Sequence, residues 1–165
     1  MDAKPLLVEI GRHLHDLNLD AVLIGNAAAA LQGAPVTTVD FDFLFRKTTR
    51  NMEKLKALAT ALGAVVLRPY YPASELYRVV RDDDGLQVDF MTTIHGIRSF
   101  AGLRDRAETI EIDGVAFRVA ALDDIIRSKR AARRPRDLAV IEVLEKTREE
   151  LTRKTRTAPR ARQRK

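Results

Sequence analysis

The stretch from Val22 to Phe45, VLIGNAAAALQGAPVTTVDFDFLF, decides the fold of this chain. Its apolar start predicts a buried strand over Ala21–Ile24, and the pair Gly25-Asn26 that follows predicts a turn. The run of alanines then indicates a short helix that ends at Gly33. A glycine turn between a strand and a helix presents backbone N–H groups at the positive end of the helix dipole, so this stretch favours phosphate binding.

A second strand follows a Pro-containing loop, and its side chains alternate between acidic and aromatic. Because successive side chains of a strand point to opposite faces, we expect Phe41, Phe43 and Phe45 to share one face. Asp40 and Asp42 then share the other face, with their Cα atoms roughly 6.5–7 Å apart. Adjacent carboxylates repel each other and are costly to bury unless a positive charge lies between them. The pair therefore favours a divalent cation, and Mg²⁺ is the natural candidate because it prefers carboxylate and phosphate oxygens.

A third acid lies on a later strand. Residues Leu76–Val80 and Leu86–Met91 are expected to form two strands, joined as a hairpin by the turn sequence DDDG. In the second of them, LQVDFM, Asp89 projects from a strand whose other face is apolar. Three carboxylates that meet can hold two Mg²⁺ ions, which bind a triphosphate, activate an attacking hydroxyl and stabilise the leaving pyrophosphate.

Helical and hairpin patterns account for most of the remaining chain. In the helix expected over residues 51–62, Asn51 is the predicted N-cap and Gly63 is the residue that ends the helix. The other expected elements are helices over 5–18, 51–62 and 122–132 and from about 136 onward, a strand over 64–67, and a hairpin of strands over 109–112 and 115–119. The fold class is α/β (α+β), with a mixed, mostly antiparallel sheet, flanking helices and a C-terminal helical pair.

Composition limits the class of protein. A length of 165 residues with 45% hydrophobic content suits one domain with a genuine core. No run approaches the roughly 18–20 apolar residues of a membrane span, and the acid-containing N-terminus is not that of a signal peptide. The chain has no cysteine, which excludes disulfides and thiolate metal sites and suits a cytoplasmic protein.

The net charge of +6 is concentrated near the C-terminus. Residues 146–165 carry nine Lys and Arg against two Glu, so this segment has a charge of +7 and the rest of the chain −1. We therefore expect a folded domain over residues 1–145 and a basic, partly disordered extension over residues 146–165.

Taken together, these motifs resemble the signature of nucleotidyltransferases of the DNA-polymerase-β superfamily. That signature is an apolar strand, a glycine turn, a short helix and a Thr-x-Asp-x-Asp end, which Thr38, Asp40 and Asp42 match. The segment LQVDFM is similar to the strand that carries the third acid of the superfamily, here Asp89. The segment ALDDIIRSKRAARRPRDLAVIEVL is similar to the C-terminal helices of the small bacterial AbiEii-like (toxin–antitoxin) branch. Its Lys-x-x-Ala-x-Arg-x-x-Asp pattern is met by Lys129, Ala132, Arg134 and Asp137.

The resemblance implies a polymerase-β-like fold over residues 1–145 and a Mg²⁺-dependent nucleotidyltransferase that moves NMP from an NTP to an acceptor hydroxyl. The resemblance favours an RNA 3′ end or a protein as the acceptor, in preference to a small molecule such as an aminoglycoside. It also suggests that the protein is a toxin with an antitoxin partner. Two Mg²⁺ ions are expected, with Mn²⁺ as a substitute. The implied metal ligands are Asp40, Asp42 and Asp89, which are also catalytic, and Asp89 acts as the base or positions it. Lys129 is the fourth catalytic residue and neutralises the charge of the triphosphate. Nucleotide binding is implied for Gly25, Asn26, Thr38, Lys129 and Arg134, and Asp137 supports Lys129 or Arg134.

Two departures from the family pattern support a rival hypothesis. Asn26 stands where the family usually has Gly or Ser, and Val36 stands where many relatives carry a phosphate-neutralising Arg. The missing charge favours a catalytically idle module that binds nucleotide, RNA or a partner protein. A third hypothesis makes the basic tail an RNA anchor. Simpler interpretations also remain: the three acids as an ordinary acidic patch, Lys129 on a solvated helix face, and Arg134 with Asp137 as a local ion pair.

Overall fold

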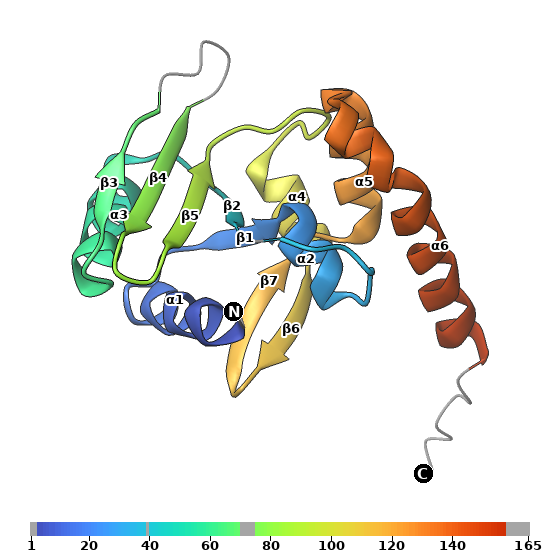
Figure 1. Ribbon diagram of the computed structural model, residues 1–165, viewed down its shortest axis with the longest axis horizontal. Coiled ribbons are helices and arrows are strands. Elements are labelled where there is room, and N and C mark those ends of the chain that lie inside the picture. The colour runs from blue at the N-terminus through green and yellow to red at the C-terminus, as the bar shows by residue number, and fades with distance from the viewer. Residues whose placement is uncertain (1–2, 39, 70–74, 158–165) are drawn as a thin grey trace.

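The computed structural model describes residues 3–38, 40–69 and 75–157, which form a single twisted sheet with helices on both faces (Figure 1). The strands are β1 (Ala21–Ile24), β2 (Phe41–Phe45), β3 (Val65–Leu67), β4 (Leu76–Arg81), β5 (Leu86–Met91), β6 (Glu108–Ile112) and β7 (Val115–Val119). The helices are α1 (Lys4–Asp16), α2 (Gly25–Leu31), α3 (Thr49–Ala61), α4 (Phe100–Arg106), α5 (Leu122–Ala132) and α6 (Pro135–Thr157).

The seven strands lie in the order β3-β4-β5-β2-β1-β7-β6. The β5–β2 and β1–β7 pairs are parallel, and the other four pairs are antiparallel. The expected mixed, mostly antiparallel sheet with flanking helices is therefore confirmed. Because β2 and β5 are parallel neighbours, two segments that are far apart in the sequence lie side by side at the centre of the sheet.

The aromatic face of β2 forms the centre of the core, as its alternation predicted. Phe41, Phe43 and Phe45 are all buried. Phe43 stacks on Phe90 of β5 with ring centroids 5.4 Å apart, and Phe45 meets the same ring edge-on at 5.8 Å. Helices α1 and α3 pack on this face, which fixes β2 firmly in place and leaves its opposite face for other chemistry.

The start of β2 differs from the expectation. The strand begins at Phe41, so Asp40 lies in a bend before it and is not a strand neighbour of Asp42. The pairing with β1 ends at Ile24↔Asp42, because the chain leaves β1 there and enters α2. The hydroxyl of Thr38 bonds the N–H and the carbonyl of Asp40, which are the groups that a strand would have used in its ladder.

Two helix starts also differ from the expectation. Helix α2 begins directly at Gly25, so the expected turn residues are its first two residues. In α3 the N-cap is Thr48, whose hydroxyl accepts a hydrogen bond from the backbone N–H of Asn51 at 3.1 Å. The expected cap, Asn51, is therefore wrong. A threonine three residues ahead satisfies the free N–H group, and the Asn51 side chain donates instead to the carbonyl of Arg46.

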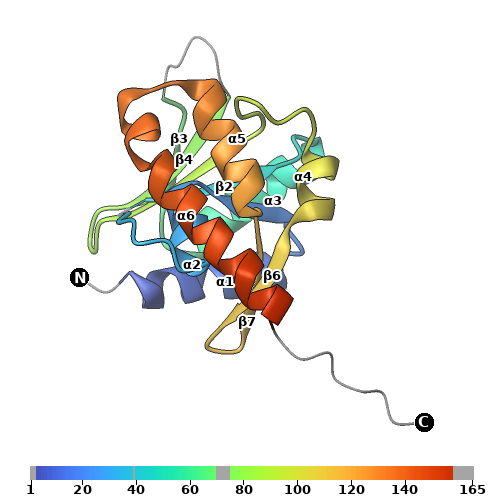
Figure 2. The ribbon, with the colours of Figure 1, turned by 90° about the vertical axis from the view of Figure 1, so that its right-hand side faces the viewer.

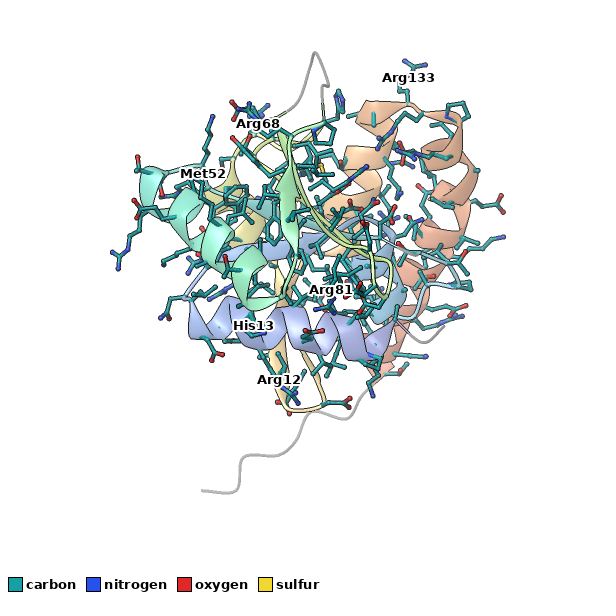
Figure 3. All side chains as sticks on the ribbon, turned by 60° about the vertical axis from the view of Figure 1, so that its left-hand side comes forward. Arg12, His13, Met52, Arg68, Arg81 and Arg133 are labelled. Atoms are coloured by element: carbon teal, nitrogen blue, oxygen red, sulfur yellow. The ribbon has the colours of Figure 1, made fainter. Side chains whose placement is uncertain are left out.

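The C-terminal helical pair is present and is seen face-on in Figure 2. Arg133 ends α5 with a φ of 55° and lies at the outer tip of the turn, and α6 starts at Pro135 (Figure 3). Helix α6 continues to Thr157, so the extension over residues 146–165, which we expected to be partly disordered, is helical as far as Thr157; residues 158–165 lie outside the described residues. None of the helices in the described ranges is long and apolar enough to cross a membrane.

Candidate functional site

A row of charged residues crosses the centre of the sheet on the face opposite the phenylalanines. In the parallel β2–β5 pair, Asp42 lies directly opposite Asp89. In the antiparallel β4–β5 pair, Arg78 lies directly opposite Asp89. Directly opposed residues project from the same face of a sheet. The strand register thus places the third acid beside Asp42, although 46 residues separate them in the sequence.

Asp89 is buried and bound by an arginine that the sequence analysis did not include. Only 7% of Asp89 is exposed. Its Oδ1 accepts a hydrogen bond from Nε of Arg78 at 2.7 Å, and its Oδ2 accepts one from Nη2 at 2.8 Å. The signal for this pair was present in the hairpin: extending both strands up to the DDDG turn pairs Arg81 with Leu86 and therefore Arg78 with Asp89.

Gly25 lies against Asp42. It is the first residue of α2, has a φ of +70°, and sits so close that a Cβ placed on it would be 2.6 Å from Oδ2 of Asp42. Both the backbone conformation and the contact require glycine here. The start of α2, which we expected to bind phosphate, therefore adjoins the carboxylate that we expected to bind metal.

The loop before β2 is held by its own side chains. The hydroxyl of Thr38 donates to the carbonyl of Asp40 at 2.7 Å and accepts from the Asp40 N–H at 3.3 Å. Nδ2 of Asn26 lies 3.4 Å from the carbonyl of Thr37, which joins the start of α2 to the same loop. Thr38 and Asn26, both expected to bind nucleotide, thus hold the bend that carries Asp40.

Three expected residues meet at the junction of α5 and α6. Nζ of Lys129 lies 3.2 Å from Oδ1 of Asp137, and Nε of Arg134 lies 2.5 Å from its Oδ2. Only 3% of Asp137 is exposed. Burial alone would raise the pKa of Asp137, but the hydrogen bonds from Arg134 and Lys129 hold that pKa below its usual range. Asp137 is therefore an ionised anchor for two cations.

The electrostatics of Asp42 link these separate groups. Burial raises the pKa of the Asp42 carboxyl to about 6, and the nearby charges of Asp89 and Asp40 raise it further, while Lys129 and Arg134 act in the opposite direction. Asp40, Asp89, Lys129 and Arg134 therefore all lie near enough to Asp42 to influence its carboxyl group. A half-buried carboxylate near two others, with one oxygen lying against the backbone of Gly25, fits a divalent cation in charge and in donor chemistry.

The acids are not gathered into a closed ligand set. Within the described ranges, no group of three or more His, Asp or Glu side chains is arranged to hold a metal ion. Both oxygens of Asp89 are engaged by Arg78. Two surface cavities, of about 330 Å³ between α1, β7 and α4 and about 450 Å³ between α4, α5 and α6, do not contain Asp40, Asp42 or Asp89.

Comparison with known families gives one match. A family model described as "Nucleotidyl transferase of unknown function (DUF2204)" matches residues 3–162, which is nearly the whole chain. The sequence has no match among curated proteins.

Several solved structures share the fold. A Thermotoga maritima protein designated a nucleotidyltransferase has a TM-score of 0.55 at 20% identity, over 90% of this chain and 92% of that one. The antibiotic-resistance factor ANT(2″)-Ia, in complex with adenylyl-2″-tobramycin, has a TM-score of 0.59 at 16% identity, over 92% of this chain and 97% of its own. The lincosamide antibiotic adenylyltransferase LnuA, bound to lincomycin, has a TM-score of 0.62 at 8% identity, over 89% and 98%. At such identities these likenesses establish the fold, which is that of the polymerase-β-like nucleotidyltransferases.

Proposed function

Because the chain belongs to the nucleotidyl transferase family DUF2204, its reaction class is nucleotidyl transfer, and we propose that it moves a nucleoside monophosphate from an NTP to an acceptor hydroxyl in a Mg²⁺-dependent reaction. One observation carries the proposal. The strand register sets Asp42 opposite Asp89, on the face where Gly25 touches Asp42.

Each group of the site has a role in this reaction. Asp40 and Asp42 would hold Mg²⁺, with Asp89 as the third acid. The cation supplies charge neutralisation for the triphosphate and for the leaving pyrophosphate. The acceptor oxygen forms a bond to the α-phosphorus, the bond from that phosphorus to the bridging oxygen breaks, and the acceptor proton passes to Asp89 or to water that Asp89 positions.

The triphosphate is bound by groups on two sides of the site. The backbone N–H groups of Gly25 and Asn26, at the start of α2, bind its outer phosphates. Lys129 and Arg134 neutralise its charge, and Asp137 keeps both cations in place through the contacts described above. In this proposal Thr38 contributes through the bend that carries Asp40.

The acceptor that we propose is an RNA 3′ end or a protein side chain, as in a toxin that is paired with an antitoxin. The concentration of nine Lys and Arg residues in positions 146–165 supports a polyanionic acceptor, because basic side chains neutralise backbone phosphates without reading sequence. The AbiEii-like assignment remains a prediction. A small-molecule hydroxyl is the competing acceptor, since ANT(2″)-Ia in complex with adenylyl-2″-tobramycin and the lincosamide antibiotic adenylyltransferase LnuA share the fold over most of the chain.

The test is incubation with each labelled NTP, Mg²⁺ and, in separate reactions, total RNA, protein extract and a panel of aminoglycosides and lincosamides. Label in one acceptor class identifies the substrate. Asp40→Ala and Asp89→Ala are expected to abolish both labelling and pyrophosphate release. Asp123→Ala, which removes a mostly exposed carboxylate of α5, is the matched control and should keep full activity.

The rival function is that of an idle binding module, which the missing charge at Val36 favours. An idle module would bind NTP in a Mg²⁺-dependent way without releasing pyrophosphate under any of these conditions. Unchanged pyrophosphate release in Asp40→Ala or Asp89→Ala would instead show that the acids are wrongly assigned.

A further inference from the structure

Asp42, Asp89 and Arg78 lie in a row across three neighbouring strands. The guanidinium of Arg78 is therefore on the side of Asp89 that faces away from Asp42. We propose that Arg78 is a positioning residue: its guanidinium fixes the carboxylate of Asp89 beside Asp42, in the orientation that nucleotidyl transfer needs. The inference rests on the proposed function and adds a residue to its site.

The contact has the geometry of a fixed support. Nε and Nη2 of Arg78 lie 2.7 Å and 2.8 Å from the two oxygens of Asp89. Two parallel bonds to one carboxylate fix its plane as well as its position, which a single bond from a lysine cannot do. An ionised carboxylate has about four lone-pair directions. Two bonds from Arg78 therefore leave Asp89 the capacity to bind a cation or to accept the proton of a hydroxyl.

The charges around Asp89 explain why a support is needed. Asp89 is 7% exposed and lies beside Asp42, whose own ionisation is opposed by burial and by neighbouring carboxylates. A buried anion among other anions is strongly disfavoured unless a cation is hydrogen-bonded to it. Lys129 and Arg134 donate to Asp137, whereas Arg78 donates to Asp89. Arg78 thus compensates the charge of Asp89 and holds its carboxylate in place at the centre of the sheet.

Arg81 offers a matched control on the same strand. It also binds carboxylates through its guanidinium, those of Glu9 and Asp84, with distances of 2.7–3.0 Å. Being three residues further along β4, it projects from the opposite face of the sheet, toward α1 (Figure 3). Replacing Arg81 therefore removes a comparable ion-pair network without touching the row of acids.

The experiment measures binding of Mn²⁺ to the nucleotide-free protein by electron paramagnetic resonance, together with the thermal midpoint of each variant. We expect Arg78→Lys and Arg78→Met each to weaken Mn²⁺ binding by about 10–100-fold, as loss of a residue that supports a metal ligand does. Asp89→Asn should have a similar effect. The double variant R78M/D89N should bind no more weakly than D89N, because Arg78 acts through Asp89. R81M should lower the thermal midpoint and leave Mn²⁺ affinity unchanged.

Three results would overturn the inference. Unchanged or tighter Mn²⁺ binding in R78K would show that the pair of hydrogen bonds from the guanidinium is not needed. R78K retains the positive charge, so it serves as the test variant if R78M does not fold. An additional loss in the double variant would show that Arg78 acts separately from Asp89. A matching loss in R81M would reduce the effect to general destabilisation. Failure of the proposed function is distinct, because D42N would then bind Mn²⁺ like the wild type.

Discussion

At the scale of single residues, the ionised carboxylate of Asp42 is energetically unfavourable in the folded protein. Burial raises its pKa to about 6 from an ordinary value of 3.8, with Asp89 and Asp40 adding to the effect. A carboxyl whose pKa rises on folding binds protons more tightly in the folded state. Its contribution to stability is therefore complete below about pH 3.8 and is lost as the pH rises through about 6. Above that pH the ionised Asp42 destabilises the fold.

Asp42→Asn is accordingly expected to stabilise the protein at pH 8 by about 1–3 kcal/mol, with the difference shrinking to near zero by pH 4. Urea unfolding of both proteins across this pH range measures it. Excess Mg²⁺ at pH 8 should stabilise the wild type and leave the variant unchanged, because the cation needs the ionised carboxylate. A variant that is no more stable than the wild type at pH 8 without Mg²⁺ would contradict the account.

The same scale shows what the sequence could and could not predict about the site. The two-residue alternation was enough to place Asp42 on the face opposite the phenylalanines. Asp40 was misplaced, because the hydroxyl of Thr38 competes for its backbone groups, and local pattern does not reveal that competition. Arg78 was missed because a basic residue in a half-exposed strand is ordinary, and only the hairpin register gives it a partner.

At the scale of elements, the start of α2 is a tightly constrained junction between a strand and a helix. Gly25 combines a φ of +70° with a position where a Cβ would lie 2.6 Å from Oδ2 of Asp42. Gly63, just after α3, has a φ of +62° and nothing within 4 Å of the same added atom. The two glycines share the backbone requirement and differ in the contact, so they form a matched pair.

Gly25→Ala and Gly63→Ala are both expected to cost about 1 kcal/mol of stability, because alanine is strained at positive φ. Only Gly25→Ala should also lower nucleotidyl transfer, by at least about 10-fold, since the new methyl group displaces the Asp42 carboxylate. Circular dichroism and urea unfolding measure the first effect and pyrophosphate release the second. Equal activity in the two variants would mean that the approach of Gly25 to Asp42 has no catalytic importance.

Element boundaries were less predictable than element types. The expected strands and helices all exist, but α2 starts at the glycine itself, α3 is capped by Thr48, and α6 runs to Thr157. The start of α3 is set by a single side-chain hydrogen bond, and the last turns of α6 are exposed, so no apolar stripe marks where that helix ends. Periodicity reports the interior of an element and carries little information about its ends.

At the scale of the whole molecule, the decisive feature is the parallel pairing of β2 with β5. The hydrophobic pattern of each strand indicates that it is buried. The sequence of neither strand indicates which strand it pairs with or in which register. The meeting of Asp42 with Asp89 was therefore an inference from family resemblance. The fold establishes it physically by inserting the α3, β3 and β4 segment between two strands that end as neighbours.

The positive charge of the chain is concentrated near its C-terminal end, and this gives a prediction about the acceptor. Residues 155–165 contain five Lys and Arg and no acid. If RNA is the acceptor, deleting them should weaken RNA binding and reduce the slope of log K against log salt by up to about 3.5, at about 0.7 for each phosphate contact on a single strand. Filter binding from low to high salt measures the slope, and Mg²⁺-dependent binding of NTP in the absence of RNA should not change. A tail with the same residues in scrambled order is the control and should bind like the wild type, because this electrostatic contribution does not depend on sequence. RNA binding that survives the deletion with an unchanged slope would remove the tail from the interface and shift the search for an acceptor to protein or small-molecule hydroxyls.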